Sequence, residues 1–185
     1  MRRQITNDRI VVRAFDSSDV DSLHEAVCES VDEMSPFETW CHSGYSVEEA
    51  AEYIDWWMKA RDAGRAFYFA VEDATEHTLL GACGLSGYST EHRRAMLGYW
   101  IRTSRTRRGH ATLAARMVCH AGFADLGLLR IEIEVPTTNV ASQCVAEKLG
   151  AVREGVLRKR LVLPDGPSDV IAYSILQSEW KRLPD

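Results

Sequence analysis

The sequence has no apolar run near the about 20 residues that a membrane-spanning helix needs, and its first residues lack the apolar core of a secretory signal peptide. None of its five cysteines forms a Cys-x-x-Cys pair, and its six histidines show no His-x-x-x-His spacing. These absences argue against a membrane protein, a disulfide framework and a metal site. We therefore expect a cytoplasmic protein that holds no metal ion.

Positive charge is absent from a long segment near the start of the chain. Residues 16–55 contain twelve acidic residues and no lysine or arginine, whereas residues 102–108 contain four arginines and no acidic residue. The net charge of −5, from 22 basic and 27 acidic residues, averages over these two regions and gives no support to nucleic-acid binding. The split predicts an acidic surface that attracts amines and a basic turn that attracts phosphate.

The length of 185 residues fits one domain, to which we assign residues 1–185. Runs of β-branched and aromatic residues predict seven strands, and apolar spacing with capping signals predicts four helices. The expected strands are 10–15, 66–71, 78–85, 95–101, 130–135, 152–163 and 169–176, and the expected helices begin near residues 16, 46, 109 and 139. This order predicts an α/β fold with a mixed sheet.

An arginine-rich turn leads from a strand into a helix at Gly109. The free N–H groups and positive dipole end of a helix bind anions, and a glycine lets a ligand approach the backbone. Thr112 adds a hydroxyl donor, while Arg105, Arg107 and Arg108 add charges that suit phosphate. The turn matches neither G-x-x-x-x-G-K-[ST] nor G-x-G-x-x-G. A helix start with a solvated arginine cluster is the alternative interpretation.

A second helix start lies at Asn139, directly after another expected strand. Asparagine is a common helix cap, and Ser142 lies one turn further along the same face. Lys148 suits either a solvated helix end or a phosphate contact. Two helix N-termini after two successive strands suit a long ligand that carries a diphosphate.

Four motifs in order, at 97–101, 106–111, 139–150 and 169–174, resemble those of the GNAT superfamily of acetyl-CoA-dependent N-acetyltransferases. Within it they are most similar to the ribosomal-protein N-terminal acetyltransferases of the RimJ/RimL type. Thr106 stands where the family's diphosphate loop has Gln or Arg, whereas Gly109 and Ala111 match it. The agreement in order and spacing extends over about residues 8–181.

The resemblance implies a seven-stranded, mostly antiparallel mixed sheet with helices on both faces, in which two central strands splay apart and form the cofactor cleft. It implies acetyl-CoA as the cofactor and allows a homodimer. It implies that the backbone of Ile101, Arg102 and Thr103 pairs with the pantetheine arm. It also implies that the diphosphate is held by the amides of Arg107, Arg108, Gly109, His110, Ala111 and Thr112. The remaining implied cofactor-binding residues are Asn139, Ser142 and Lys148.

In this family the acceptor amine attacks the thioester directly, so the protein must orient two substrates and accept a proton. Ala146 stands where many members have a tyrosine acid, which makes Ser142 the candidate acid beside the sulfur. Met96 stands where this group often has a glutamate, so no motif assigns the base. The candidate bases are Glu38, Glu91, His92 and Glu134.

The missing base favours a weakly basic acceptor. An α-amine with a pKa of about 7.7–8.0 is roughly a tenth neutral at pH 7, whereas a lysine amine at about 10.4 is less than a thousandth neutral. In the resemblance the acidic helices line the acceptor side, where Phe37, Trp40 and Tyr45 form an apolar wall and Trp56 and Trp57 pack the helix.

We therefore predict an N-acetyltransferase that acts on the N-terminal α-amine of a protein or peptide. A small amine such as an aminoglycoside, a polyamine or an amino acid is the alternative acceptor. A catalytically weak, acyl-CoA-binding regulatory module is the alternative outside catalysis.

Overall fold

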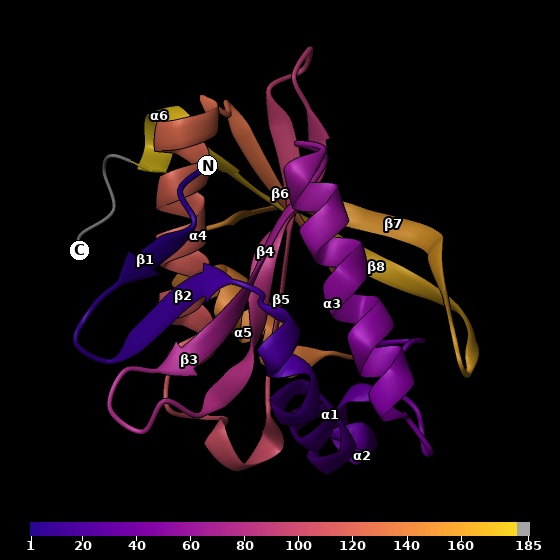
Figure 1. The fold of residues 1–185 in the computed structure, drawn as a ribbon. Coiled ribbons are helices and arrows are strands. Elements are labelled where there is room, and N and C mark those ends of the chain that lie inside the picture. The colour runs from indigo at the N-terminus through magenta and orange to yellow at the C-terminus, as the bar shows by residue number, and fades with distance from the viewer. Residues whose placement is uncertain (181–185) are drawn as a thin grey trace.

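The computed structural model describes residues 1–180, which form one eight-stranded sheet with helices on both faces (Figure 1). Residues 181–185, the end of the assigned domain, lie outside the described residues. The sheet order is β1-β2-β3-β4-β5-β6-β8-β7. The strands are β1 (Gln4–Thr6), β2 (Ile10–Ala14), β3 (Phe67–Asp73), β4 (Leu79–Ser89), β5 (Arg94–Ile101), β6 (Arg130–Pro136), β7 (Val152–Leu163) and β8 (Gly166–Leu176).

Every neighbouring pair in this sheet is antiparallel except β5 and β6. The predicted mixed, mostly antiparallel sheet is therefore confirmed, with one strand more than expected. The additional strand, β1, pairs with β2 through contacts such as Ile5 opposite Val12. Its three residues are too few to show the period-two alternation by which a strand is recognised in a sequence.

The helices begin where the capping signals place them. Asp16 and Ser46 each form a capping box with an acidic residue three positions later, and Gly127 ends the long helix in a left-handed conformation. The first expected helix is divided at the buried Ser30. The helices are α1 (Val20–Glu29), α2 (Val31–Met34), α3 (Val47–Asp62), α4 (His110–Leu126), α5 (Val140–Lys148) and α6 (Gln177–Trp180), with 3₁₀ turns η1 (Ser17–Asp19) and η2 (Thr103–Arg105).

The two faces of the sheet carry separate hydrophobic cores because strand side chains alternate. On β3, Phe67 and Phe69 pack in the core under α4, whereas Tyr68 and Ala70 belong to the core under α1 and α3. Figure 1 shows α3 crossing one face of the sheet, with α4 and α5 behind it. No helix among residues 1–180 is long and apolar enough to span a membrane.

Candidate active site

The parallel strands β5 and β6 are paired over only part of their length. The ladder joins Arg94 to Arg130 and ends at Met96 opposite Glu132, yet β5 continues to Ile101 and β6 to Pro136. Beyond Met96 the two strands therefore have no backbone pairing with each other, while β4 and β8 still pair with their outer sides. This geometry opens a cleft in the middle of the sheet.

The direction of the β5 backbone shows which residues face this cleft. Arg102 N donates to Leu80 O at 2.7 Å, so by the alternation of an antiparallel ladder the N–H and C=O groups of Tyr99 and Ile101 point away from β4, toward the opening. Thr103 N donates to Ser30 Oγ at 3.1 Å.

The N–H groups of Arg102 and Thr103 already donate hydrogen bonds within the protein. The prediction that they pair with the pantetheine arm is therefore wrong. Their carbonyls are also engaged, since they accept hydrogen bonds from Arg105 N and Thr106 N. The predicted pairing at Ile101 stays a prediction, and Tyr99 joins it as a residue whose backbone faces the opening.

Within residues 1–180, the turn before α4 leaves backbone N–H groups without acceptors. Gly109 is the N-cap with φ +81°, and no side chain caps the helix. The amides of His110, Ala111 and Thr112 precede the first carbonyl-bonded amide of the helix, Leu113 N, which donates to Gly109 O. A Cβ placed on Gly109 has no atom within 4 Å, so the backbone here is open to a ligand.

His110 is buried at this helix start, with 7% of its surface exposed. Burial lowers the pKa of His110, and the charges of Arg9 and Arg108 lower it further. The ring is therefore neutral, and the positive charges around the turn come from arginine side chains.

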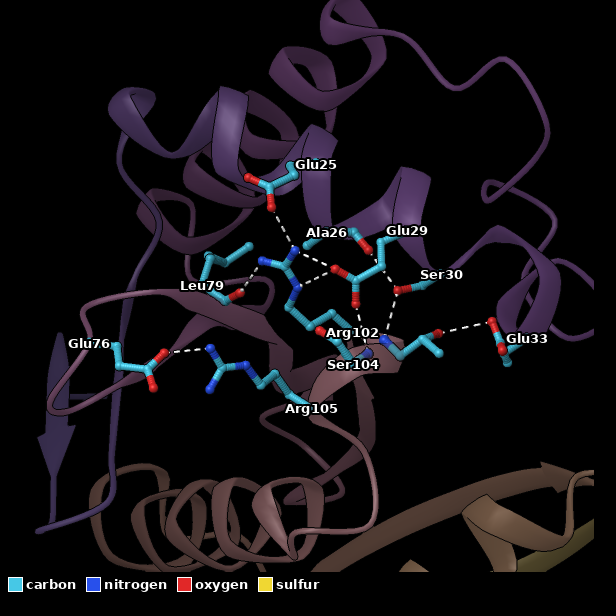
Figure 2. A network of polar contacts seen from close by, with 11 residues as sticks. Glu25, Ala26, Glu29, Ser30, Glu33, Glu76, Leu79, Arg102, Ser104 and Arg105 are labelled. Atoms are coloured by element: carbon cyan, nitrogen blue, oxygen red, sulfur yellow. Dashed lines mark hydrogen bonds and ion pairs between the residues drawn. The ribbon is translucent and has the colours of Figure 1, made fainter.

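Two of the four arginines of residues 102–108 are used within the protein (Figure 2). The side chain of Arg102 is 8% exposed and pairs with Glu25 and Glu29 of α1. Arg105 pairs with Glu76. The prediction that Arg105 supplies charge for a phosphate is therefore corrected.

Arg107 and Arg108 are exposed and have no ion pair among the described residues, so they are the charges that remain for an anion. Arg9 also reaches this turn, since its Nη2 donates to Arg108 O at 2.7 Å. Sequence reasoning missed Arg9, because a contact across 99 positions leaves no local signal.

Some of the acidic residues of 16–55 form hydrogen bonds and ion pairs within the protein. Glu29 accepts from Arg102 and from Ser104 N, and Glu33 accepts from the Thr103 hydroxyl. Asp19 pairs with Arg13. Glu29 and Glu33 therefore hold the basic turn in place, while the attraction of amines to the acidic surface stays a prediction.

Ser142 lies beside a residue that the sequence did not single out. Its Oγ is 3.0 Å from Tyr99 Oη, and Tyr99 Oη also donates to Ser142 O at 3.0 Å. Asn139 Oδ1 accepts from Ser142 N at 3.0 Å and so caps α5, as its position predicts. Burial raises the pKa of Tyr99, which keeps its hydroxyl protonated. Strand β5 and helix α5 thus place two hydroxyls together beside the opening.

The candidate bases differ in what surrounds them. Glu134 accepts from Arg160 Nε at 3.0 Å through both carboxylate oxygens, and Glu91 and His92 are exposed. Glu38 is half-buried, and its hydrogen-bond donor is Trp40 Nε1 at 2.8 Å. Burial raises the pKa of Glu38 above its usual value. Glu38 is therefore the candidate whose carboxylate is desolvated and not held by an arginine.

Glu38 lies in a cavity of about 440 Å³ on the α3 side of the sheet. Trp40 lines this cavity, whereas Tyr45 is buried in the core and Phe37 is not among the lining residues. Trp56 and Trp57, expected to pack the helix, line the cavity. The lining residues are Glu38, Trp40, Tyr53, Trp56, Trp57, Tyr68, Ser86 and Trp100.

Residues 9–152 match the family description "Acetyltransferase (GNAT) domain". The chain belongs to the GNAT acetyltransferases. It is an acyltransferase of this family, similar in sequence to the uncharacterized N-acetyltransferase YoaA of Bacillus subtilis, with 30% identity over 94% of this chain and 96% of YoaA. The ribosomal-protein-serine acetyltransferase of Escherichia coli is 22% identical over 91% of this chain and 93% of the relative.

Solved structures show the same fold at lower identity. The ribosomal-protein-S5-alanine acetyltransferase of Vibrio fischeri has a TM-score of 0.85 at 23% identity, covering 96% of this chain and 98% of that one. RimL, a ribosomal L7/L12 α-N-protein acetyltransferase solved with coenzyme A, has a TM-score of 0.83 at 20% identity, covering 94% and 97%.

GNAT acetyltransferases use acetyl-CoA, and the observed geometry fits such a molecule. The cleft between β5 and β6 offers unpaired backbone along one strand, and the open backbone at Gly109 offers amides to a diphosphate. Arg107 and Arg108 are exposed beside that turn. The unpaired backbone of the cleft therefore suits an extended arm, and the open turn suits a charged end.

Proposed function

We propose that this GNAT protein transfers the acetyl group of acetyl-CoA to the N-terminal α-amine of a protein or peptide, by direct attack within a ternary complex. Ile101 pairs with the pantetheine arm, and the amides from Arg107 to Thr112 hold the diphosphate. Asn139, Ser142 and Lys148 contact the same ligand from α5. Acetyl-CoA supplies the activated acetyl group.

The α-amine is chosen because the carboxylates along the cleft strands are paired with arginines. Met96 stands at the end of the β5–β6 ladder, and Glu132 opposite it pairs with both Arg94 and Arg130. Glu134, the next residue on the same face, pairs with Arg160. A carboxylate held by arginine is a weak proton acceptor, because the positive charge stabilises its ionised form.

Weak bases favour an amine of low pKa, because its ammonium gives up a proton more readily. An α-amine meets that condition at pH 7 far better than a lysine side chain does. Ser142 is the proposed donor toward the departing sulfur, and its Oγ lies 3.0 Å from Tyr99 Oη, which donates its own proton to Ser142 O. The names of the ribosomal-protein acetyltransferases among the relatives support a protein N-terminus as the acceptor.

A small amine is the second candidate, and the cavity of about 440 Å³ favours it, because small-molecule pockets typically measure about 300–1,000 Å³. A panel experiment separates the candidates. Peptides with free N-termini, the same peptides with blocked N-termini, and small amines are incubated with acetyl-CoA and analysed by mass spectrometry.

Acetylation at the N-terminus that stops when the terminus is blocked supports the proposal. Acetylation of lysine side chains, with free α-amines left unmodified, contradicts it. Binding of acetyl-CoA without turnover on any amine favours a regulatory module instead.

A further inference from the structure

The cavity that contains Glu38 has walls of stacked and tilted aromatic rings. Trp57 stacks on Tyr68 with ring centroids 4.1 Å apart, and Trp40 lies 5.2 Å from Tyr53 and 5.9 Å from Trp100. Helix α3, strand β3, strand β5 and the segment before α3 each contribute a ring. The faces of such rings attract cations within about 6 Å of the ring centroid.

Glu38 is the acidic residue of this lining, and among residues 1–180 no lysine, arginine or histidine lines the cavity. Among the described residues, Glu38 forms no ion pair, whereas Glu29, Glu72 and Asp125 are each paired with an arginine. Trp40 Nε1 donates to one of its oxygens at 2.8 Å. A desolvated carboxylate without a cation is costly, and a bound ammonium would offset that cost.

The cavity reaches β5 at the place where the sheet opens. A Cβ on Gly98 would lie 2.4 Å from Tyr68 Oη, so the phenol of this lining residue rests directly on β5 at Gly98. Gly98 lies two positions beyond Met96, the last residue paired with β6. The cavity and the cofactor cleft therefore meet at the same stretch of strand from opposite faces of the sheet.

We propose that this cavity is the acceptor subsite, in which Glu38 is the counter-ion of the acceptor's ammonium and takes its proton. The proposal rests on the proposed acetyltransferase function and names the acceptor class. The acceptor is an amine that carries an apolar or aromatic group and no carboxylate beside the amine.

The selectivity follows from the charges of the lining. A peptide N-terminus or an amino acid amide brings one positive charge to one negative charge. A free amino acid also brings a carboxylate, which would meet Glu38 and aromatic faces without a cationic partner. The site therefore rejects free amino acids and accepts N-termini with large apolar first residues.

The proton balance assigns a role to Glu38. The bound ammonium gives one proton to the Glu38 carboxylate, and the neutral nitrogen forms the N–C bond to the acetyl carbonyl carbon as the C–S bond breaks. The second proton of the nitrogen reaches the departing sulfur, for which Ser142 is the donor. Glu38 then releases its proton to water, so the products are an amide, a thiol and one proton.

The test measures binding without turnover. Phenylalaninamide and phenylalanine are titrated into the protein without acetyl-CoA, and the fluorescence of the cavity tryptophans is followed. We expect phenylalaninamide to bind at least about tenfold more tightly than phenylalanine, and Glu38→Gln to lose about tenfold for phenylalaninamide. Glu48→Gln, which removes an exposed charge outside the cavity, is the matched control and keeps wild-type binding.

Equal binding of phenylalaninamide and phenylalanine, or unchanged binding in Glu38→Gln, overturns the inference. Turnover of a peptide with the same KM and kcat in Glu38→Gln also overturns it, while the proposed function survives. If Glu38-dependent binding is found but no amine is acetylated by the wild-type protein, the amine site is supported and the proposed function fails.

Discussion

Arg102 at the end of β5 and Glu29 on α1 form an ion pair, with Arg102 Nε 2.9 Å from Glu29 Oε2. The other oxygen of Glu29 accepts from Ser104 N at 2.7 Å (Figure 2). One carboxylate therefore holds both the guanidinium and the 3₁₀ turn that leads to Gly109. Because α1 also packs against α3, the helices of the acceptor side and the turn of the cofactor side are held in one arrangement.

Replacing Glu29 with glutamine removes the charge that pairs with a guanidinium only 8% exposed. We expect Glu29→Gln to lower the free energy of unfolding by about 1.5–3 kcal/mol, the range for hydrogen bonds to charged groups. Urea denaturation measures the loss. Glu25→Gln is the matched control, since Glu25 contacts the same guanidinium but its side chain is 71% exposed, and it should lose less than about 1 kcal/mol. Equal losses of unfolding free energy in the two variants would contradict the role of Glu29 as the main partner of Arg102.

The same pair predicts how stability changes with pH. The hydrogen bond from Arg102 lowers the pKa of Glu29 from 4.5 to about 2. A lowered pKa stabilises the folded protein above pH 4.5, and that contribution is lost as the pH falls toward 2. Asp125 and Glu154 also have lowered pKa values, so their contributions to the stability of the protein are lost at similar pH. The quantity to follow is therefore the difference in unfolding free energy between wild type and Glu29→Gln. We expect the two unfolding free energies to converge as the pH falls from 4.5 toward 2. A difference that does not depend on pH would rule out the ion pair as its source.

Alanine substitutions at Gly109 and Gly127 distinguish an effect of backbone strain from an effect on ligand binding. Gly109 and Gly127 both have left-handed φ values, +81° and +60°, at opposite ends of α4. Alanine at either position should cost about 1–2 kcal/mol of stability. Only Gly109→Ala places a methyl group where the diphosphate approaches the backbone, so only this variant should raise the KM for acetyl-CoA, by at least about threefold. Equal KM values in the two variants would remove Gly109 from the cofactor site.

Local signals allowed most of the fold to be predicted. The capping boxes at Asp16 and Ser46 and the left-handed Gly127 act within a few residues of the elements that they delimit. The strand missed, β1, is held by its pairing with β2 and has no periodicity of its own. The break at Ser30 was missed, and Ser30 is there bonded to Thr103, 73 positions away.

The sequence predicted the helix starts of the site but not the partners of its side chains. The glycine at 109 and the cap at Asn139 have local signatures, and the structure places both at helix starts. The four arginines of residues 102–108 look alike in the sequence, yet two are paired with glutamates from distant segments. The aromatic cavity around Glu38 joins α3, β3, β4 and β5, a combination that no local pattern reveals.

Ser142 and Tyr99 form a pair of hydroxyls whose roles differ in the proposed reaction. Ser142→Ala removes the proposed donor to the sulfur, and we expect kcat to fall by about tenfold to a hundredfold. Tyr99→Phe removes the hydroxyl that contacts both Ser142 Oγ and Ser142 O, so kcat should fall less, by about threefold to tenfold. Steady-state rates at saturating peptide and acetyl-CoA measure both.

Asn139→Ala is a further α5 variant, since Asn139 caps the helix and is also a proposed contact of acetyl-CoA. It removes the cap of α5 and should cost about 1 kcal/mol of stability. If Ser142→Ala and Asn139→Ala both keep the full rate, α5 does not contribute to catalysis and the role given to Ser142 is wrong.

Glu38 predicts the acid side of the pH–rate profile. Burial raises the pKa of Glu38, and protonation of its carboxylate prevents it from holding an ammonium. Below pH 7 an α-amine is almost entirely ammonium. Changes of kcat/KM in that range therefore reflect the titration of a group on the enzyme. We expect kcat/KM for the peptide to fall in one step with a midpoint above 4.5, and this step to be absent from Glu38→Gln.

The hydrogen bond from Trp40 gives this pH prediction a second test. It stabilises the ionised carboxylate, so Trp40→Phe should move the midpoint to higher pH. A profile that instead falls continuously from about pH 7.7 downward would mean that the enzyme binds the neutral amine. In that case Glu38 would not be the counter-ion, because a carboxylate that meets a neutral amine has no charge to balance.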